Sequence, residues 1–545
     1  MNKKMLCILL AGSMLLSLAA CKTTKPQETT ETTTVSTSET TEATTTTAAS
    51  ETTETTETAP SESTGFPEKG CKLEFPTGER YHYDMDLALD TKENTISGHV
   101  DFAFFNDSED DWDKLCLRDY SSLFKNPKDA GYDAGIETHG KLTEITNIKD
   151  SRDGSALDYE REDKDVSVVW IPLNSKLAPG EKMTLSYDFV AKIPTVADRY
   201  GVSDGVFNVT NFYPILAEYT KDGWSHIGFY AVGECFYSEI SDYDVKLTVP
   251  SDMVVLSTGV EKGETSSDYA KTISIFAECV RDFVFSGSEK FKLIEGDYKD
   301  THVRTAYIEE EKPEYDKMEA EYAQKAAIDS LEAFGSAFGE YPYKDLEVIL
   351  APISAGGMEY PNLVIISKAY VDANESEQSR KNIYQMSADN VVSHEVGHQW
   401  FMGIVGSNSG LQPWLDESFA SFTEYVYEVA VYPDKNHTQP ITLNNDDIDN
   451  YTKINRSYFD YQSDFSYIAA VYWDGKDVLI DMHDILGEEE FYGIVREYVH
   501  EYAFRNADQT DFFRILYKHS GTENTTLNML IRKYFTEDVQ PSKFA

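Results

Sequence analysis

The stretch SHEVGHQWF, residues 393–401, has the residue types and spacing of a metal site. His394 and His398 are four residues apart, with Glu395 directly after the first histidine. On a helix, side chains four residues apart project from the same face, so the two imidazoles can bind one ion. A zinc ion in a hydrolytic site has three protein ligands and one open position for water. The stretch therefore predicts a zinc site whose third ligand lies elsewhere in the chain.

Glu417 is the candidate for that third ligand. Eighteen residues separate it from His398, and the surrounding text QPWLDESFASFTEY suits a second helix packed antiparallel to the first. A carboxylate on that helix can reach the ion across the helix pair. Glu395 is then placed to accept a proton from water whose pKa the metal lowers toward ~7. We therefore expect one Zn²⁺ per chain, bound by His394, His398 and Glu417.

These residues resemble a known family. The motif, the eighteen-residue spacing and the text W-L-D-E-S-F-A around Glu417 are similar to the M1 family of zinc aminopeptidases (gluzincins), which usually has W-L-N-E-G-F-A there. GGMEYP resembles the family's G-x-M-E-N signature, which lies on a strand ahead of the zinc helix. The resemblance implies that Glu359 binds the free α-amine of the substrate and that the backbone of Gly356, Gly357 and Met358 pairs with the peptide. An ammonium held at a fixed distance from zinc makes the first peptide bond the one attacked.

A tyrosine completes the implied catalytic set. VYWDGKDVLIDMHDILGEEEF resembles the family segment Y-x-K-G-x-x-V, with L-L-G further on, in which the tyrosine hydrogen-bonds the oxyanion. That register assigns the role to Tyr472, with Tyr461 and Tyr467 as weaker candidates. A phenol aimed at developing negative charge stabilises a tetrahedral intermediate.

The match departs from the family at four positions. Tyr360 and Asp416 each replace the usual asparagine, Ser418 replaces glycine, and Asp474 stands where lysine is common. None of these changes removes a ligand, the base or the oxyanion donor, so they are compatible with catalysis and leave the substrate preference open.

A second anchor for the substrate amine is unassigned. Family members often take an acidic or amide residue for this purpose from the N-terminal domain, in a stretch like P-x-D-A-R-x-x-F-P. Here that place reads GVFNVTNFYPILAEY, where Asn208 and Asn211 are the candidates. The chain stops at Ala545, about where the catalytic domain of the family would end. The large helical domain of longer members is thus expected to be absent, which leaves a more open active site.

Periodicity separates two folded domains. Apolar residues alternate in stretches such as KMTLSYDFV and DVKLTVP, as in strands that bury one face. PEYDKMEAEYAQKAAIDSLEAFGSAF, residues 313–338, reads as a long helix, and residues 381–401 as the helix with the two histidines. DLEVILAPI and NLVIIS read as strands on either side of GGMEYP. The expected fold is α+β and multidomain, with an antiparallel β saddle domain followed by a thermolysin-like, mainly helical metallopeptidase domain.

The N-terminus has the pattern of an exported lipoprotein. Lys3 and Lys4 precede an apolar run that is too short to span a membrane, as in a secretory signal. The ending Leu-Ala-Ala-Cys21 resembles a bacterial lipobox, which implies lipidation of Cys21. The Thr- and Glu-rich stretch that follows has almost no large apolar residue and is expected to be a flexible tether. We expect a lipoprotein signal peptide at 1–20, a tether at 21–69, the β saddle domain at 70–292 and the catalytic domain at 293–545. The protein is then expected on the extracellular face of the bacterial cell membrane, held by lipid.

Charge and cysteine content restrict the partners and the bonding. The formal net charge of -47 argues against nucleic acid as a partner. Cys71, Cys116, Cys235 and Cys279 follow the predicted signal and Cys21. They allow three disulfide pairings or four free thiols, and spacing does not choose among these.

Three functions fit these observations. The first is an aminopeptidase that acts on peptides with free N-termini. The second is a thermolysin-like endopeptidase, in which an amine-binding Glu359 has no purpose. The third is a non-catalytic surface module that binds peptides. The complete set of metal ligands, base and oxyanion donor argues against this third function. The aminopeptidase is the favoured interpretation.

Overall fold

A computed structural model describes residues 65–126, 128–129, 131, 139–230, 232–369, 371, 375–435, 437 and 451–544. The predicted signal peptide, Cys21 and the tether up to residue 64 lie outside these residues, so the lipid anchor stays a prediction. Residues 67–545 form one compact unit. No helix among the described residues is long and apolar enough to cross a membrane.

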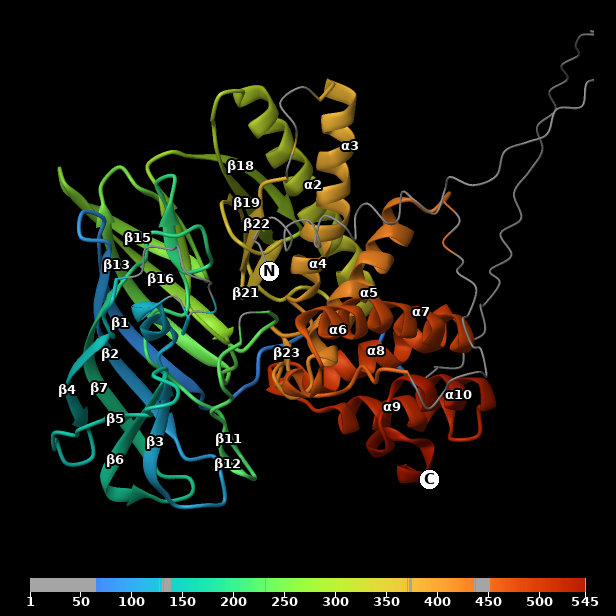
Figure 1. Ribbon diagram of the computed structural model, residues 1–545, viewed down its shortest axis with the longest axis horizontal. Coiled ribbons are helices and arrows are strands. Elements are labelled where there is room, and N and C mark those ends of the chain that lie inside the picture. Colours follow the sequence, from blue (N-terminus) through green and yellow to red (C-terminus); the bar gives the residue numbers. More distant parts are fainter. Residues whose placement is uncertain are drawn as a thin grey trace, which may run out of the picture. The chain divides into compact units, whose positions relative to one another are not determined.

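A seven-stranded sheet dominates the first part of this unit, which we call the β region (residues 67–290; Figure 1). Its order is β15-β16-β13-β1-β2-β7-β4, and its neighbours are antiparallel except for the parallel pair β1 and β13. The strands are β1 (Tyr81–Asp90), β2 (Thr95–Phe105), β4 (Glu144–Asp150), β7 (Lys182–Lys192), β13 (Ser241–Pro250), β15 (Val260–Ser266) and β16 (Ala270–Val280). The predicted alternation is present in β7, where Met183, Leu185, Tyr187 and Phe189 are buried.

Smaller sheets complete the β region. One has the order β10-β3-β6-β5 and another β14-β17-β9-β8, and β11 pairs with β12. Their strands are β3 (Trp112–Arg118), β5 (Glu160–Arg161), β6 (Val168–Leu177), β8 (Gly201–Ser203), β9 (Val206–Val209), β10 (Ile215–Leu216), β11 (Tyr219–Thr220), β12 (Gly223–Trp224), β14 (Val254–Ser257) and β17 (Phe285–Ser288). A 3₁₀ turn, η1, spans Tyr120–Lys125.

A five-stranded sheet of order β18-β19-β20-β22-β21 opens the second part, the helical region (residues 291–544). Its strands are β18 (Phe291–Tyr298), β19 (Thr301–Ile308), β20 (Asp345–Ala351), β21 (Gly357–Tyr360) and β22 (Leu363–Ser367). The long helix α2 (Pro313–Phe338) packs on β18 and β19 and ends at Gly339, as the sequence predicts. GGMEYP supplies β21, which pairs antiparallel with β22 and is the last strand of the sheet. Because β18 pairs with β19, this sheet begins at Phe291.

Helices fill the rest of this region. They are α3 (Glu377–Ser387), α4 (Ser393–Gly397), α5 (Trp414–Val431), α6 (Asp464–Ile468), α7 (Gly475–Leu486), α8 (Glu488–Tyr502), α9 (Gln509–Ser520) and α10 (Thr525–Tyr534). Two π-helical segments, η2 (Ala388–Val392) and η5 (Ala469–Asp474), join α3 to α4 and α6 to α7. Shorter elements are η4 (Tyr458–Asp460), η6 (Glu537–Val539), η7 (Pro541–Lys543) and the paired strands β23 (Val405–Gly406) and β24 (Arg505–Asn506).

The predicted helix at 381–401 differs at both ends. It starts at Glu377, where Ser376 caps it by accepting a hydrogen bond from the Ser379 amide. The α-helix ends at Gly397, and the chain then turns through Met402, whose φ of 122° is incompatible with helix. The described cysteines are free thiols, which decides between the disulfides and thiols that the sequence left open: Cys71, Cys116, Cys235 and Cys279.

Candidate active site

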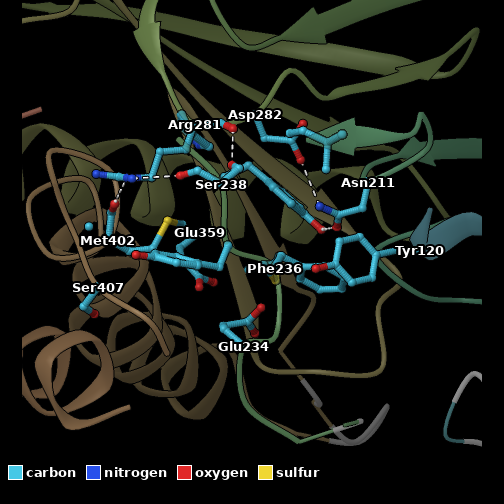
Figure 2. Close-up of a pocket in the computed structure, with 16 residues that line it drawn as sticks. Tyr120, Asn211, Glu234, Phe236, Ser238, Arg281, Asp282, Glu359, Met402 and Ser407 are labelled. Atoms are coloured by element: carbon cyan, nitrogen blue, oxygen red, sulfur yellow. Dashed lines mark hydrogen bonds between the residues drawn. The ribbon is translucent and has the colours of Figure 1, made fainter. Parts of the chain in front are cut away.

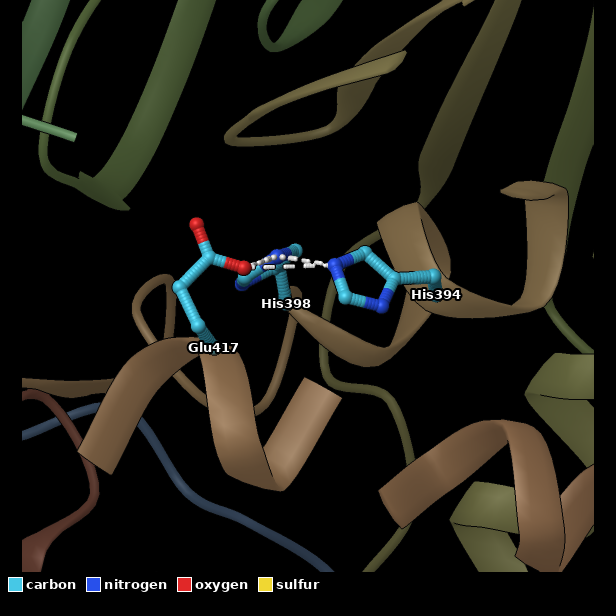
Figure 3. A group of neighbouring side chains, drawn as sticks. All are labelled: His394, His398 and Glu417. Carbon is cyan, nitrogen blue, oxygen red and sulfur yellow. Dashed lines mark hydrogen bonds and ion pairs between the residues drawn. The ribbon is translucent and has the colours of Figure 1, made fainter. Parts of the chain in front are cut away.

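His394, His398 and Glu417 come together as predicted (Figure 3). His394 lies on α4, His398 follows its last residue, and Glu417 lies in the first turn of α5. Glu417 Oε2 lies 3.3 Å from His394 Nε2 and 3.4 Å from His398 Nε2. The two Nε2 atoms are 3.2 Å apart. Three possible ligand atoms therefore surround one point.

These distances fit zinc. Zinc bonds of about 2.0–2.2 Å in a tetrahedral site place the ligand atoms about 3.3–3.6 Å from one another. The donor set of two imidazoles and one carboxylate is also typical of a hydrolytic zinc site with an open position. The residues present thus suit the metal that the sequence predicts.

Carboxylates on α5 orient both histidines. His394 Nδ1 lies 3.0 Å from Glu424 Oε1, and His398 Nδ1 lies 2.7 Å from Asp416 Oδ1. With each Nδ1–H donated to a carboxylate, each Nε2 keeps its lone pair for a cation. Glu424 also accepts a hydrogen bond from Lys476. Asp416, one of the positions at which this sequence differs from the usual family motif, is therefore the hydrogen-bond partner of the candidate metal ligand His398.

The site favours a cation in its centre. Burial by itself would lower the pKa of His394, but hydrogen bonds to Glu417 and Glu424 raise it to about 9. Burial would raise the pKa of Glu417, but the two histidines hold it well below its ordinary value. The three groups therefore hold a proton among them, or a metal ion in its place.

A glycine permits the close approach of α4 and α5. A Cβ at Gly397 would lie 2.0 Å from Thr423 Oγ1. Any larger residue in the fourth position of H-E-x-x-H would push the helices apart. The short distance between the histidines and Glu417 thus depends on this contact.

Glu395 faces β21 beside the metal site. It is buried, and a Cβ at Gly357 would lie 2.2 Å from its Oε1. Gly357 therefore gives the carboxylate room against the strand. Burial raises the pKa of Glu395 to about 7, which suits a group that takes and returns a proton near neutral pH.

Glu359 on β21 lies next to the metal ligands. A carboxylate oxygen of Glu359 lies within 4.8 Å of a ring nitrogen of His398 and of a carboxylate oxygen of Asp416, and only 3% of the residue is exposed. Among the described residues, its Oε1 has no hydrogen-bond partner. A buried carboxylate oxygen without a partner costs free energy unless a cation or donor binds there. Glu359 is thus suited to an ammonium ligand.

The backbone around Glu359 leaves one strand edge free. The Gly356 carbonyl accepts a hydrogen bond from Ser367, and Gly357 and Met358 pair with β22. In the described part of the chain, the opposite edge of β21 has no strand neighbour. An extended peptide can add to such an edge.

Tyr472 on η5 lies over the metal site. Its ring stacks on that of His394 with centroids 6.0 Å apart. Burial and the nearby Glu417 carboxylate raise the pKa of Tyr472 well above its ordinary value, so the phenol keeps its proton and can donate it. Tyr467 is buried beside it, with ring centroids 6.0 Å apart. Tyr461 instead donates its hydroxyl to the backbone at Ile454.

The amides of Asn208 and Asn211 have other partners. Asn208 donates to the Asp198 carbonyl and accepts from Ser286. Asn211 donates to Asp282 and accepts from Tyr360. A second amine anchor would need a side chain that is free to bind the substrate, and both of these side chains are already hydrogen-bonded within the protein.

Glu234, which sequence reasoning missed, lines the same cavity as Glu359. It sits on the loop between β12 and β13, is 8% exposed, and lines with Glu359 a cavity of about 30 Å³, enough for a water-sized group (Figure 2). Burial raises the pKa of Glu359 well above its ordinary value, and Glu234 is the carboxylate that adds most to this rise. A single acidic residue among aromatic and small ones in FYAVGECFY was the available signal.

The second part of the chain is similar to known proteins. Residues 322–534 match the Peptidase family M1 domain. Aminopeptidase M1-B of Oryza sativa subsp. japonica is 28% identical over 291 residues, which are 51% of this chain and 32% of the relative. Aminopeptidase N of Haemonchus contortus is 26% identical over 294 residues, 50% of this chain and 29% of the relative. Aminopeptidase N of Lactococcus lactis subsp. lactis is 29% identical over 217 residues, 37% of this chain and 25% of the relative. The chain thus spans about a third or less of the length of these relatives.

Proposed function

We propose that this chain, whose residues 322–534 match the peptidase family M1 domain, is a zinc-dependent aminopeptidase. It removes residues from the free N-termini of peptides. The observation that carries the proposal is the buried Glu359 carboxylate: its Oε1 has no partner among the described residues, and one of its two oxygens lies within 4.8 Å of His398 and Asp416. A carboxylate in that position binds the substrate ammonium and sets its distance from the metal.

His394, His398 and Glu417 would hold the zinc ion. When bound, zinc supplies a Lewis acid that polarises the substrate carbonyl and makes water more acidic. Glu395, the residue after His394, accepts the proton of the attacking water and gives it to the leaving amine. Its raised pKa of about 7 suits both steps.

Tyr472 donates its phenol proton in a hydrogen bond to the oxygen that becomes negative in the transition state. The ring stack on His394 holds it beside the metal site. Because burial keeps the phenol protonated, the donor is already in place before charge develops.

Two carboxylates bind the substrate amine in this proposal. Glu359 contributes its unpartnered oxygen, and Glu234 faces the same cavity from the β region. The backbone of Gly356, Gly357 and Met358 binds the peptide at the free edge of β21. The cavity has room for a water-sized group, which suits an ammonium.

We also propose that the protein acts at the outer surface of a bacterial membrane. The lipobox-like ending at Cys21 and the Thr- and Glu-rich tether support a lipid anchor with a spacer. The formal net charge of -47 supports peptides rather than nucleic acid as partners.

The test compares matched peptide libraries with free and with acetylated N-termini. The protein is incubated with each library, with and without a zinc chelator, and products are identified by mass spectrometry. We expect loss of single N-terminal residues from free peptides only, abolished by the chelator and restored by added zinc. Equal cleavage of acetylated peptides would instead indicate an endopeptidase. Absence of chelator-sensitive cleavage would indicate a peptide-binding module.

A further inference from the structure

The loop that carries Glu234 is fixed by contacts with both regions. The Tyr230 ring stacks on Tyr458 of the helical region, with centroids 4.0 Å apart. Gly233 lies so close to Tyr467 that a Cβ would come within 2.4 Å of its hydroxyl. On the other side of Glu234, the Cys235 carbonyl accepts a hydrogen bond of 3.0 Å from Tyr120. These contacts bring the backbone of Glu234 to the cavity.

Arg199 fixes the side chain of Glu234. Its Nη1 lies 3.1 Å from Glu234 Oε1 and 2.9 Å from Oε2. The side chains are 18% and 10% exposed, so solvent screens this ion pair weakly. The guanidinium also lies over the ring of Phe236, 5.2 Å from its centroid.

The backbone of Arg199 is held as well. Its amide donates to Asp198 Oδ1, and its carbonyl accepts a hydrogen bond of 2.8 Å from Thr210. The Arg199 side chain therefore extends toward Glu234 from a fixed backbone position. The Glu234 carboxylate cannot turn away from the cavity without breaking its ion pair with Arg199.

Charge gives this pair a role in substrate binding. Two buried carboxylates that face one cavity oppose each other's ionisation. Burial raises the pKa of Glu234 to about 8, and the Arg199 guanidinium opposes this rise, so loss of Arg199 would raise the pKa of Glu234 further. When both carboxylates are ionised, Glu234, Glu359 and Arg199 together carry one net negative charge, which matches the charge of one ammonium ion.

We propose that Arg199 is a positioning residue for the substrate amine: its contact with Glu234 holds that carboxylate oriented toward the cavity that Glu359 also lines. The proposal rests on the aminopeptidase function above. The ligand class is the protonated α-amine of a peptide, and Arg199 acts on it only through Glu234.

A double-mutant cycle tests this role. The variants R199Q, E234Q and R199Q/E234Q are compared with the wild type for cleavage of one free peptide. We expect each single variant to raise KM about tenfold or more and to change kcat about twofold or less, because the affected contact binds substrate and transition state alike. The double variant should be no worse than E234Q, because Arg199 acts through Glu234. R199K should restore part of the loss.

A matched control separates this role from general stability. Arg152 binds Asp150 through a similar ion pair elsewhere in the β region, so R152Q should leave KM unchanged. An unchanged KM in R199Q, or KM effects of R199Q and E234Q that multiply in the double variant, would overturn the proposal. Chelator-sensitive trimming of free peptides by the wild type tests the aminopeptidase function separately, so the two failures can be told apart.

Discussion

Each histidine of the metal site makes two contacts, one through each ring nitrogen. His394 and His398 direct one ring nitrogen to the metal position and the other to a carboxylate, Glu424 or Asp416. The second contact selects the tautomer that leaves Nε2 free to bind metal. Sequence spacing predicts the contact with the metal, while the contact with a carboxylate depends on which side chains of α5 lie next to the rings.

Replacing the proposed base, in E395Q, should lower kcat at least about 100-fold. The amide cannot accept the proton of the attacking water, but its size is unchanged, so the contact with Gly357 is preserved. Steady-state kinetics measure the loss, and atomic absorption should show an unchanged zinc content. Full activity in E395Q would assign the base to another residue.

Replacing the outer partner of His394, in E424Q, should weaken zinc binding roughly 10- to 100-fold. The variant removes the charge that orients the ring and leaves Lys476 without its charged partner. Competition with a chromophoric chelator measures the affinity. E428Q, on the exposed face of the same helix, is the control and should bind zinc as the wild type does. Equal affinities in the two variants would contradict this role.

At the scale of elements, glycines set how closely the helices around the site pack. Gly397 brings α4 against α5, and Gly475 brings the start of α7 against Ser418 of α5. The second contact also positions η5, because Ser418 donates a hydrogen bond to the Val471 carbonyl, one residue before Tyr472. Ser418, where the family usually has glycine, is thus part of the support for the oxyanion donor.

The variant G475A should lose about 1–3 kcal/mol of unfolding free energy and part of kcat. Its Cβ would lie 2.1 Å from Ser418 Oγ, so α7 and η5 must move and Tyr472 moves with them. Denaturant unfolding and kcat are the measurements. Adding S418G removes the colliding atoms, so G475A/S418G should be no less stable than S418G alone. A G475A variant as stable as the wild type would show that the helices separate without cost.

At the scale of the whole unit, Arg281 joins the β region to the segment that follows α4, the helix that carries His394. This buried guanidinium donates to the carbonyls of Met402, Gly403 and Arg505, and also to Ser238 and the side chain of Asn506. A Cβ at Gly406 would collide with it. The two regions that supply Glu234 and Glu359 are therefore connected by directional hydrogen bonds as well as apolar packing.

The variant R281M should lower the unfolding free energy by at least about 3 kcal/mol, because several buried carbonyls lose their donor. Differential scanning calorimetry or chemical denaturation measures this loss. R514M removes an exposed guanidinium that pairs with Glu501 and should change stability little. Equal stability of the two variants would mean that Arg281 is not needed to join the regions.

The sequence by itself determined the local parts of this protein. Helix periodicity places His394 and His398 on one face, the spacing to Glu417 predicts the third ligand, and alternation predicts strands such as β7. These features depend on backbone geometry over a few residues, or on a short motif with a fixed partner.

Only the tertiary structure revealed Glu234, the second carboxylate of the proposed amine-binding site. Glu234 lies on a loop without periodicity, and its partner Arg199 is 35 residues earlier in the chain. Asn208 and Asn211 looked suitable in sequence, but their amides have partners in distant strands and loops. Which polar group stays free at a site depends on every neighbour that the fold brings to it, and one chain's sequence does not encode that in any local pattern.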